Sequence, residues 1–315
     1  MTSDLRTPVT GTTSDAAAAS QAENLSVTIL GCRSGMPAGG QASSGYLVET
    51  PGARLLLDAG PGISLALSER GGPETLDAVV ISHFHVDHCY DLLPLGKSLV
   101  RRLLRIAGPM PDDAQPVDEA DFRSVPLYVP RGGRALLTRW AGLFPIPTLP
   151  VFDKAFEVGF DVREYGPGDI LEIGDCEVTM HGLPHAAPNC GARVSSPHGV
   201  VAYTGDTGMS ERLVDLARAA DVFLAEATLL HHDDGDHGHL CGREDGEIAA
   251  AAGVGRLVLT HFISGSARWL GSLRADAASE FSGPIDIARP GDRYAVDGPT
   301  VAAPAVEAVA EAAAT

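Results

Sequence analysis

Cysteine is scarce in this sequence of 315 residues, and its arrangement excludes two classes of small scaffold. The number of cysteines, five, is odd, and no two of them form a Cys-x-x-Cys pair. A disulfide framework uses an even set, and a structural zinc ribbon uses paired Cys-x-x-Cys motifs. The sequence therefore predicts a protein of a reducing compartment, with free thiols at positions 32, 89, 176, 190 and 241.

Basic residues are also few, because 23 Lys and Arg stand against 41 Asp and Glu, a formal net charge of −18. A surface of this charge repels long nucleic acids but does not exclude a small anionic substrate drawn to a buried cation. No apolar run is long enough to span a membrane, and the first residues lack the basic start and apolar core of a signal peptide. We expect a cytoplasmic protein.

The chain is predicted to form one domain between two unstructured ends. Residues 1–24 are rich in Thr, Ser, Ala and Asp without apolar periodicity, which predicts a disordered leader. Residues 25–300 alternate strand-like apolar runs with helical segments, and the Ala-rich residues 301–315 form a tail. An insertion that could act as a lid is predicted at 97–124, since residues 109–124 are rich in proline and acidic residues.

Several of the strand-like runs end in histidine or aspartate. They read "VVISHFH", "VTMHGLPH", "VVAYTGD" and "LVLTH". When strand ends meet at one edge of a sheet, side chains from distant parts of the sequence can reach one point. This pattern is the main organisational feature of the sequence.

The segment "ISHFHVDHCYD" at 81–91 concentrates side chains that can bind metal. Residues two apart in an extended segment face the same side, so His83 and His85 can bind one ion together. Asp87 and His88 follow directly and can serve a second, adjacent ion. Imidazole and carboxylate groups suit zinc, manganese or iron.

Three more distant residues can complete the two ligand sets. His185 ends one strand-like run and can join the first set, and His261 ends another and can join the second. Asp206 lies between Gly205 and Gly208, where the backbone can turn sharply and present a carboxylate to both ions.

In chain order these seven residues resemble the signature of the metallo-β-lactamase superfamily, which is His-x-His-x-Asp-His followed by a His, a bridging Asp and a last His. The segment "LDAGPGI" at 57–63 shares the likeness. The resemblance implies an α/β fold, the four-layer αβ/βα sandwich, with two divalent ions, zinc first among the candidates, at one edge. Two such ions lower the pKa of a shared water to about 7 and so provide a hydroxide. The implied ligands are His83, His85 and His185 for one ion and Asp87, His88 and His261 for the other, with Asp206 as the bridge and Asp87 also orienting the nucleophile.

The stretch 225–261 resembles the ribonuclease Z-like branch of that superfamily. It contains Glu-Ala-Thr and then His239 in "GHLCGRE", whose implied role is to donate a proton or to bind the phosphate. Leu240 and Cys241 replace the small hydroxyl residues of that branch, which places a hydroxyl contact with phosphate in doubt. The interval between His185 and Asp206 has room for a hairpin but not for a tRNA-binding arm. The chain looks similar to actinobacterial ribonuclease Z-like phosphodiesterases that act on cyclic nucleotides.

The leading hypothesis is a dinuclear metal-dependent phosphodiesterase for a small substrate such as a cyclic nucleotide, with no tRNA partner. The alternative is hydrolysis of a thioester or lactone, because the same hydroxide would serve. A non-catalytic binding module is the third reading, but such modules usually lack ligands and none is missing here. Dimers are common in the superfamily, so the resemblance also allows a homodimer.

Overall fold

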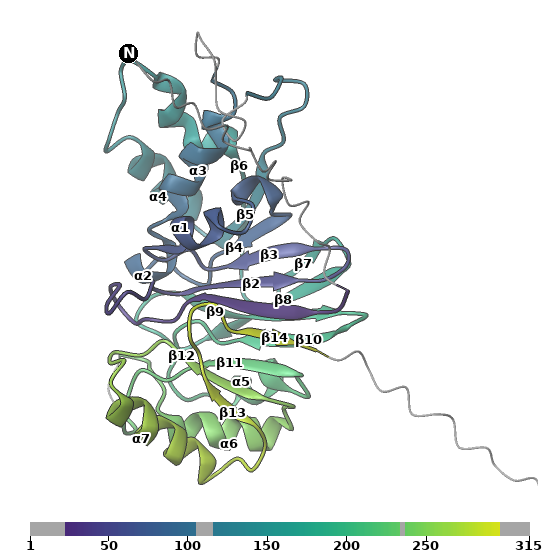
Figure 1. Cartoon of the computed structure of the whole chain (residues 1–315), viewed down its shortest axis with the longest axis vertical. Helices are drawn as coiled ribbons and strands as arrows, with labels where there is room; N and C mark the ends of the chain where they lie inside the picture. Colours follow the sequence, from purple (N-terminus) through teal and green to yellow (C-terminus); the bar gives the residue numbers. More distant parts are fainter. Residues whose placement is uncertain (1–22, 105–115, 234–236, 297–315) are drawn as a thin grey trace, which may run out of the picture.

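The computed structural model describes residues 23–104, 116–233 and 237–296, and in them two seven-stranded sheets lie face to face (Figure 1). The first sheet contains β1 (Ser26–Gly31), β2 (Gly45–Glu49), β3 (Arg54–Leu57), β4 (Ala78–Val80), β5 (Val125–Pro130), β6 (Phe160–Tyr165) and β14 (Arg293–Ala295). The second contains β7 (Ile170–Ile173), β8 (Cys176–Leu183), β9 (Asn189–Ser196), β10 (Gly199–Tyr203), β11 (Val222–Glu226), β12 (Leu257–Thr260) and β13 (Ile285–Ile287). Their strand orders are β14-β1-β2-β3-β4-β5-β6 and β13-β12-β11-β10-β9-β8-β7.

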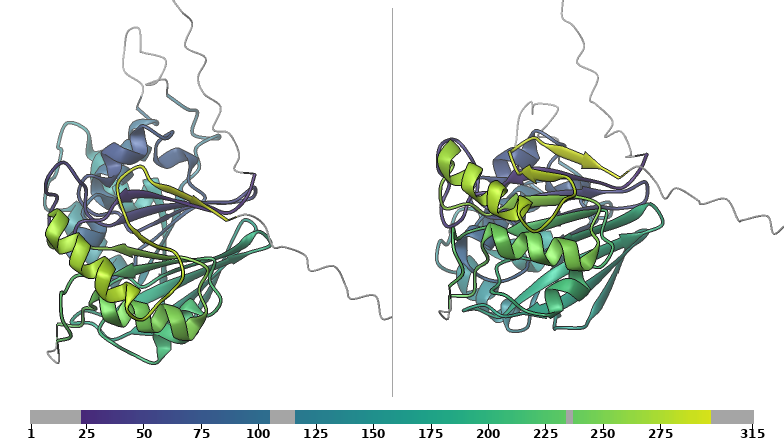
Figure 2. Two further views of the ribbon diagram at one scale, coloured as in Figure 1. Left: turned by 60° about the horizontal axis from the view of Figure 1, so that its bottom comes forward. Right: turned by 90° about the horizontal axis from the view of Figure 1, so that it is seen from below.

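Helices cover the outer face of each sheet (Figures 1 and 2). Those on the first sheet are α1 (Ile63–Ser68), α2 (Val86–Cys89), α3 (Leu92–Arg101) and α4 (Gly133–Ala141), with the short η1 (Pro73–Thr75), η3 (Pro150–Lys154) and η4 (Ala155–Gly159). Those on the second are α5 (Arg212–Ala217), α6 (Gly242–Ala252) and α7 (Ala267–Ala278). The layers run helix, sheet, sheet, helix, so the predicted four-layer α/β sandwich is confirmed.

Strand β3 shows how the sequence specifies two cores. Side chains alternate across a strand, so Leu55 and Leu57 pack into the core between the two sheets while Leu56 packs into the core beneath α1, α3 and α4. A strand that is buried on both faces is continuously apolar rather than alternating. This explains the uninterrupted apolar run that predicted the strand.

Parallel pairing determines where the functional residues lie. Strands β3 to β6 are parallel to one another, and so are β10 to β13. In such sheets the carboxyl ends of neighbouring strands share an edge, and ligands usually bind there. His83 follows the end of β4, Asp206 the end of β10 and His261 the end of β12.

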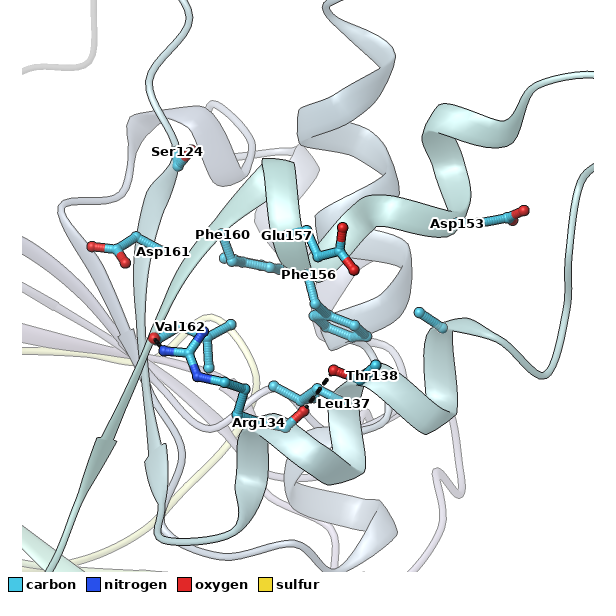
Figure 3. Close-up of a pocket in the computed structure, with 11 residues that line it drawn as sticks. Ser124, Arg134, Leu137, Thr138, Asp153, Phe156, Glu157, Phe160, Asp161 and Val162 are labelled. Atoms are coloured by element: carbon cyan, nitrogen blue, oxygen red, sulfur yellow. Dashed lines mark hydrogen bonds between the residues drawn. The ribbon is translucent and has the colours of Figure 1, made fainter.

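A cavity of about 590 Å³ lies elsewhere, between α4, η4 and the beginnings of β5 and β6 (Figure 3). Its lining includes Ser124, just before β5, and Phe160 and Val162, near the start of β6. The beginnings of these parallel strands lie opposite the carboxyl-end edge. This cavity is therefore separate from the edge that carries the histidines.

The structure corrects several sequence predictions. The run "FEVGFDVREYG" at 156–166 predicts a strand, but its first four residues belong to η4, where a Cβ on Gly159 would lie 2.8 Å from the carbonyl oxygen of Gly96 in α3. Of the predicted insertion 97–124, residues 97–101 are part of α3, and residues 105–115 lie outside the described residues. The predicted leader, apart from residues 23–24, and the predicted tail also lie outside them. None of the helices in the described part has the length and apolarity that a membrane crossing requires.

One buried carboxyl group gives a stability prediction. Asp245 on α6 is fully buried, and neither of its carboxyl oxygens has a hydrogen-bond partner within the described residues. Burial raises the pKa of this carboxyl well above its usual value, and the nearby Glu226 and Glu244 raise it further. The folded chain thus retains a proton that the unfolded chain loses, so this residue makes the protein less stable as the pH rises above the unfolded pKa.

Asp245→Asn, which keeps the shape of the neutral acid, is expected to reduce this loss. At pH 8 the variant should melt at least about 2 °C above the wild type, which corresponds to about 1 kcal/mol in a protein of this size. At pH 4 the variant and the wild type should have the same melting temperature. Thermal unfolding across this pH range measures the effect, and Glu247→Gln, at an exposed position on the same helix, is the control. A difference in melting temperature between variant and wild type that does not grow with pH would contradict the assignment of a protonated Asp245.

Candidate metal centre

The first candidate metal group gathers three histidines around Asp206. His83 Nε2 lies 3.7 Å and His185 Nε2 3.8 Å from Oδ2 of Asp206. His85 Nδ1 lies 3.1 Å from His185 Nε2, and the ligand atoms of all four side chains lie within 4.8 Å of one another. His83 and Asp206 are buried, whereas His85 is partly exposed.

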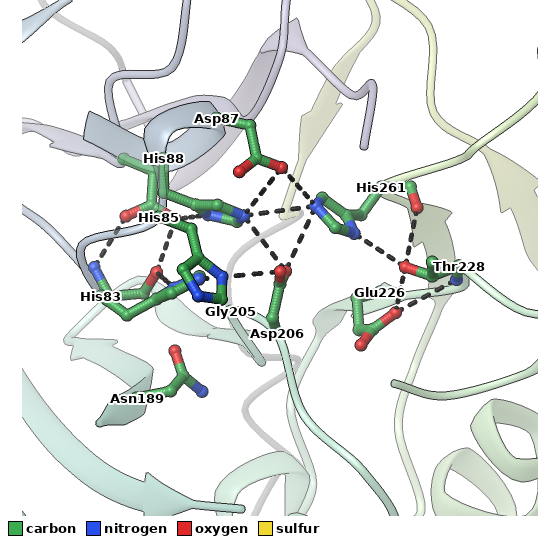
Figure 4. A network of polar contacts seen from close by, with 12 residues as sticks. His83, His85, Asp87, His88, Asn189, Gly205, Asp206, Glu226, Thr228 and His261 are labelled. Carbon is green, nitrogen blue, oxygen red and sulfur yellow. Dashed lines mark hydrogen bonds and ion pairs between the residues drawn. The ribbon is translucent and has the colours of Figure 1, made fainter. Parts of the chain in front are cut away.

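The second candidate group uses the other oxygen of the same carboxylate. His88 Nε2 lies 3.2 Å and His261 Nε2 3.3 Å from Oδ1 of Asp206. His261 Nε2 is also 3.2 Å from Oδ2 of Asp87 (Figure 4). Asp206 therefore presents one oxygen to each group, which is the arrangement of a carboxylate that bridges two cations.

The structure brings together all seven residues that the sequence nominated as ligands. His83 and His85 follow the end of β4, and His85 lies in extended backbone at the N-cap of helix α2, to which Asp87 and His88 belong. The turn into this helix directs the last two side chains toward the second group.

Hydrogen bonds outside the two groups fix the tautomers of the histidines. His185 Nδ1 lies 2.9 Å from the carbonyl oxygen of Gly238, which can only accept, so Nδ1 carries the proton. His88 Nδ1 lies 2.7 Å from the carboxylate of Asp58 and donates in the same way. Their Nε2 atoms then carry lone pairs toward Asp206.

The same logic applies to the other two buried imidazoles. Thr228 donates its hydroxyl to Glu226, and Ser82 donates its hydroxyl to Asp58, so each hydroxyl accepts from an imidazole. His261 Nδ1 lies 2.8 Å from the hydroxyl of Thr228, and His83 Nδ1 lies 3.0 Å from that of Ser82. Four Nε2 lone pairs and two carboxylates thus face one point, and Nε2 of His83 has no hydrogen-bond partner in the described structure. This donor set fits two divalent cations.

Charge in the cluster favours cations as well. Burial raises the pKa of Asp206, but His261 and His88 outweigh this effect and hold the pKa well below its usual value. Burial lowers the pKa of His88, yet Asp206 and Asp58 raise it well above the usual value. The ionised carboxylates therefore attract a positive charge to Nε2 of His88, and a divalent cation can take the place of the proton there.

Asp58 is a functional residue that the sequence reasoning did not identify. It follows β3, has a positive φ of 59°, and is completely buried. It accepts hydrogen bonds from the backbone N–H of Ser82 and from the hydroxyl of Tyr203, in addition to its contact with His88. The available signal was its position in "LDAGPGI", the segment already noted for its resemblance.

Comparison with known proteins identifies the family of this chain. A family model described as the beta-lactamase superfamily domain matches residues 53–262, which is more than half of the chain. The chain belongs to this superfamily. Its two sheets flanked by helices are consistent with the metallo-β-lactamase fold.

Relatives of this metallo-β-lactamase fold protein span most of its length. The probable metallo-hydrolase YhfI of Bacillus subtilis is 28% identical over 85% of this chain and 98% of the relative. The crystal structure of YhfI superposes with a TM-score of 0.70 at 26% identity, covering 86% of this chain and 99% of that chain. Ribonuclease Z of Thermobifida fusca is 28% identical over 85% of this chain and 93% of the relative. A diphosphatase of the PhnP family shares the fold, with a TM-score of 0.60 at 16% identity over 86% of this chain and 97% of that chain.

A hydrogen-bonded pair, His239 and Glu226, lies beside the two metal groups of this metallo-β-lactamase fold. His239 Nδ1 is 2.8 Å from Oε1 of Glu226, and Glu226 is fully buried. The His239 ring centroid is 5.2 Å from that of His185 and 5.8 Å from that of His261, so the imidazole lies next to both groups. Burial lowers the pKa of His239, but the hydrogen bond and charge of Glu226 raise it above the usual value. The sequence motif named Glu226 but did not reveal its partner.

The segment 32–35 contacts the second metal group from both sides. The backbone N–H of Gly35 donates to Oδ2 of Asp87 at 2.7 Å. Backbone bonds join Cys32 and Ser34 to Phe262, directly after His261, which has a positive φ of 58°. The buried Arg33 side chain donates to the carbonyl oxygen of Ile263 at 2.6 Å. We therefore expect this segment to orient Asp87 and His261 without touching the first group.

Arg33→Ala is expected to weaken the second ion selectively, by about 10- to 100-fold in affinity, as is typical when a residue that orients ligands is removed. Elemental analysis after dialysis should fall from two ions per chain toward one. Arg193→Ala is the matched control, because Arg193 also donates to a backbone carbonyl, that of Leu216 at 2.9 Å, but contacts neither group. Equal metal loss in both variants would refute the assignment.

Proposed function

We propose that this protein is a dinuclear metal-dependent hydrolase, and more narrowly a phosphodiesterase for a small substrate such as a cyclic nucleotide. The observation that carries the proposal is the arrangement of Asp206 between two histidine groups, with the pair His239 and Glu226 at their side. The likeness to ribonuclease Z, over most of both chains, supports a phosphodiester rather than a carbon ester.

The residues of the cluster have distinct roles in this proposal. His83, His85, His185 and Asp206 would hold one divalent ion, and Asp87, His88, His261 and Asp206 the other, with zinc, manganese or iron all compatible with the ligands. Such ions, when bound, make a hydroxide available at neutral pH and neutralise charge on the phosphate. Asp87 accepts a hydrogen bond and orients the attacking oxygen.

His239 completes the reaction as the proton donor. As the attacking oxygen bonds to phosphorus, the bond to the leaving oxygen breaks, and that oxygen takes a proton from His239. Glu226 stabilises the protonated imidazole beforehand, because its carboxylate raises the pKa of His239. The next water restores the proton to His239.

The described structure favours a small substrate over RNA. Between His185 and Asp206 the chain forms only the hairpin β9–β10, in which Ser196 pairs with Gly199. No arm extends from this interval, all of which lies within the described residues. The net charge of −18 also opposes binding of a long polyanion.

The test is a substrate panel on metal-loaded protein with elemental analysis of the same preparation. Bis-p-nitrophenyl phosphate and cAMP should be hydrolysed, and His83→Ala should remove the activity. Turnover of an acyl thioester or a lactone without turnover of either phosphodiester would favour the carbon-ester alternative. Protein that holds two ions but leaves both phosphodiesters intact would refute the phosphodiesterase.

A further inference from the structure

A second cavity, of about 440 Å³, adjoins the metal centre. It is lined by residues at the ends of β5, β6 and β8 and at the start of β9, together with the first residue of α5. The ends of β5 and β6 lie at the same edge as the end of β4, which precedes His83, because the three strands are parallel. This cavity therefore lies at the functional edge, unlike the cavity of Figure 3.

Two residues connect this cavity to the metal centre. His185, a candidate ligand, forms part of its wall, and so does the buried Asn189. A Cβ on Gly205 would lie 2.4 Å from Oδ1 of Asn189, so this amide abuts the residue before Asp206 (Figure 4). The same oxygen has no hydrogen-bond partner in the described structure. A single layer of side chains thus separates the cavity from the proposed reaction centre.

The walls of the cavity are mainly apolar and rigid. They include four prolines and a leucine, namely Pro130, Pro167, Pro184, Pro188 and Leu183. The hydroxyl of Tyr165 donates to the carbonyl of Ile81 at 2.6 Å, so only its ring is available to the cavity. Walls of this kind suit a flat ring with little charge.

Two arginines add polar groups at the rim. The guanidinium of Arg131 lies across Gly166, where a Cβ would be 2.8 Å from Cζ, and Arg212 donates to the carbonyl of Gly182 at 3.1 Å. Neither forms an ion pair with any carboxylate of the described residues, although acidic residues outnumber basic ones in the chain. Each guanidinium has five N–H donors, most of them unused here, and a flat face that stacks on aromatic rings.

We propose that this cavity is the subsite for the nucleobase of a nucleotide whose phosphodiester lies at the metal centre. This inference rests on the proposed function, which it extends to the substrate class. The flat apolar walls enclose the base, and the guanidinium groups of Arg131 and Arg212 stack on it or bind its edge. An alkyl or acyl group would fill the apolar part but would leave the unused guanidinium N–H groups at the rim without partners.

The test compares two diesters that release the same leaving group, thymidine 5′-(p-nitrophenyl phosphate) and methyl p-nitrophenyl phosphate. Arg131→Ala and the cavity-filling Ala187→Phe are each expected to lower kcat/KM for the nucleoside substrate about tenfold, the scale of one lost base-stacking contact. The same variants should leave kcat/KM for the methyl substrate unchanged. Inhibition by 5′-AMP should weaken equally, while inhibition by inorganic phosphate should not.

Arg134→Ala is the matched control, since Arg134 lines the separate cavity of Figure 3 and should change neither substrate. Melting temperatures of the variants identify any that fail to fold. If either Arg131→Ala or Ala187→Phe does not fold, the comparison of the two diesters is made with the other. If wild-type protein hydrolyses both diesters and the variants preserve their ratio, the subsite is wrong and the phosphodiesterase stands. If the loaded wild type hydrolyses neither, the phosphodiesterase itself is wrong.

Discussion

Asp206→Ala is expected to abolish hydrolysis and to release both ions. Asp206 is the only one of the seven candidate ligands whose two oxygens face different groups, Oδ1 toward His88 and His261 and Oδ2 toward His83 and His185. Bound ions lower the reaction barrier by several kcal/mol, so their loss should reduce kcat/KM by at least about a thousandfold. Steady-state kinetics and elemental analysis on one preparation measure both effects.

Variants of single groups provide the controls for this prediction. His185→Ala removes a ligand from the first group alone and His261→Ala from the second alone, so each should lose one ion and keep most of the other. Asp215→Ala, on the exposed side of α5, should retain both ions and full activity. An Asp206→Ala protein that is folded and still binds two ions would show that Asp206 does not bridge.

The gathering of the seven candidate ligands could be predicted from the sequence because most of the information is local. His83, His85, Asp87 and His88 fall within six positions, and a strand followed by a helix is enough to direct them to one place. The distant candidates each follow an apolar run. Asp206 and His261 follow strands of the parallel set β10 to β12, and His185 follows β8, which runs in the same direction as β10 because both pair antiparallel with β9. The overall fold was predicted through the resemblance that this order of residues carries.

Contacts made by strand pairing could not be predicted in the same way. Asp58 reaches His88 only because β3 pairs with β4, and although the segment "LDAGPGI" marked the region, it did not indicate this contact. Strand β14 is a three-residue edge strand with mostly exposed side chains, so it has no apolar run, and it pairs with β1 from the far end of the chain. Helix α7 was also missed, because only Leu273 and Ala277 of its residues are buried.

Removal of the proton donor is the second prediction with a large effect. His239→Ala is expected to lower kcat/KM by about 10²- to 10⁴-fold for a diester with an alkoxide leaving group, such as cAMP, because that oxygen needs a proton. With p-nitrophenolate as the leaving group the loss should be much smaller, since this anion leaves unprotonated. Both ions should remain bound, because His239 Nδ1 is occupied by Glu226 and the imidazole belongs to neither ligand set around Asp206.

The pH profile separates this role from simple phosphate binding. A proton donor must be protonated, so activity on cAMP should fall as the pH rises through the pKa of His239, which Glu226 raises despite burial. Glu226→Gln removes the charge that stabilises the imidazolium, so the alkaline limb should move to lower pH, and His239→Ala should abolish this limb. The backbone N–H of Thr207 donates to Oε1 of Glu226 and that of Thr228 to Oε2, so the glutamine keeps an acceptor for only one of them, and the melting temperature of the variant is the control for structural change. Equal losses for the two leaving groups, with an unchanged alkaline limb, would instead assign His239 to binding the phosphate.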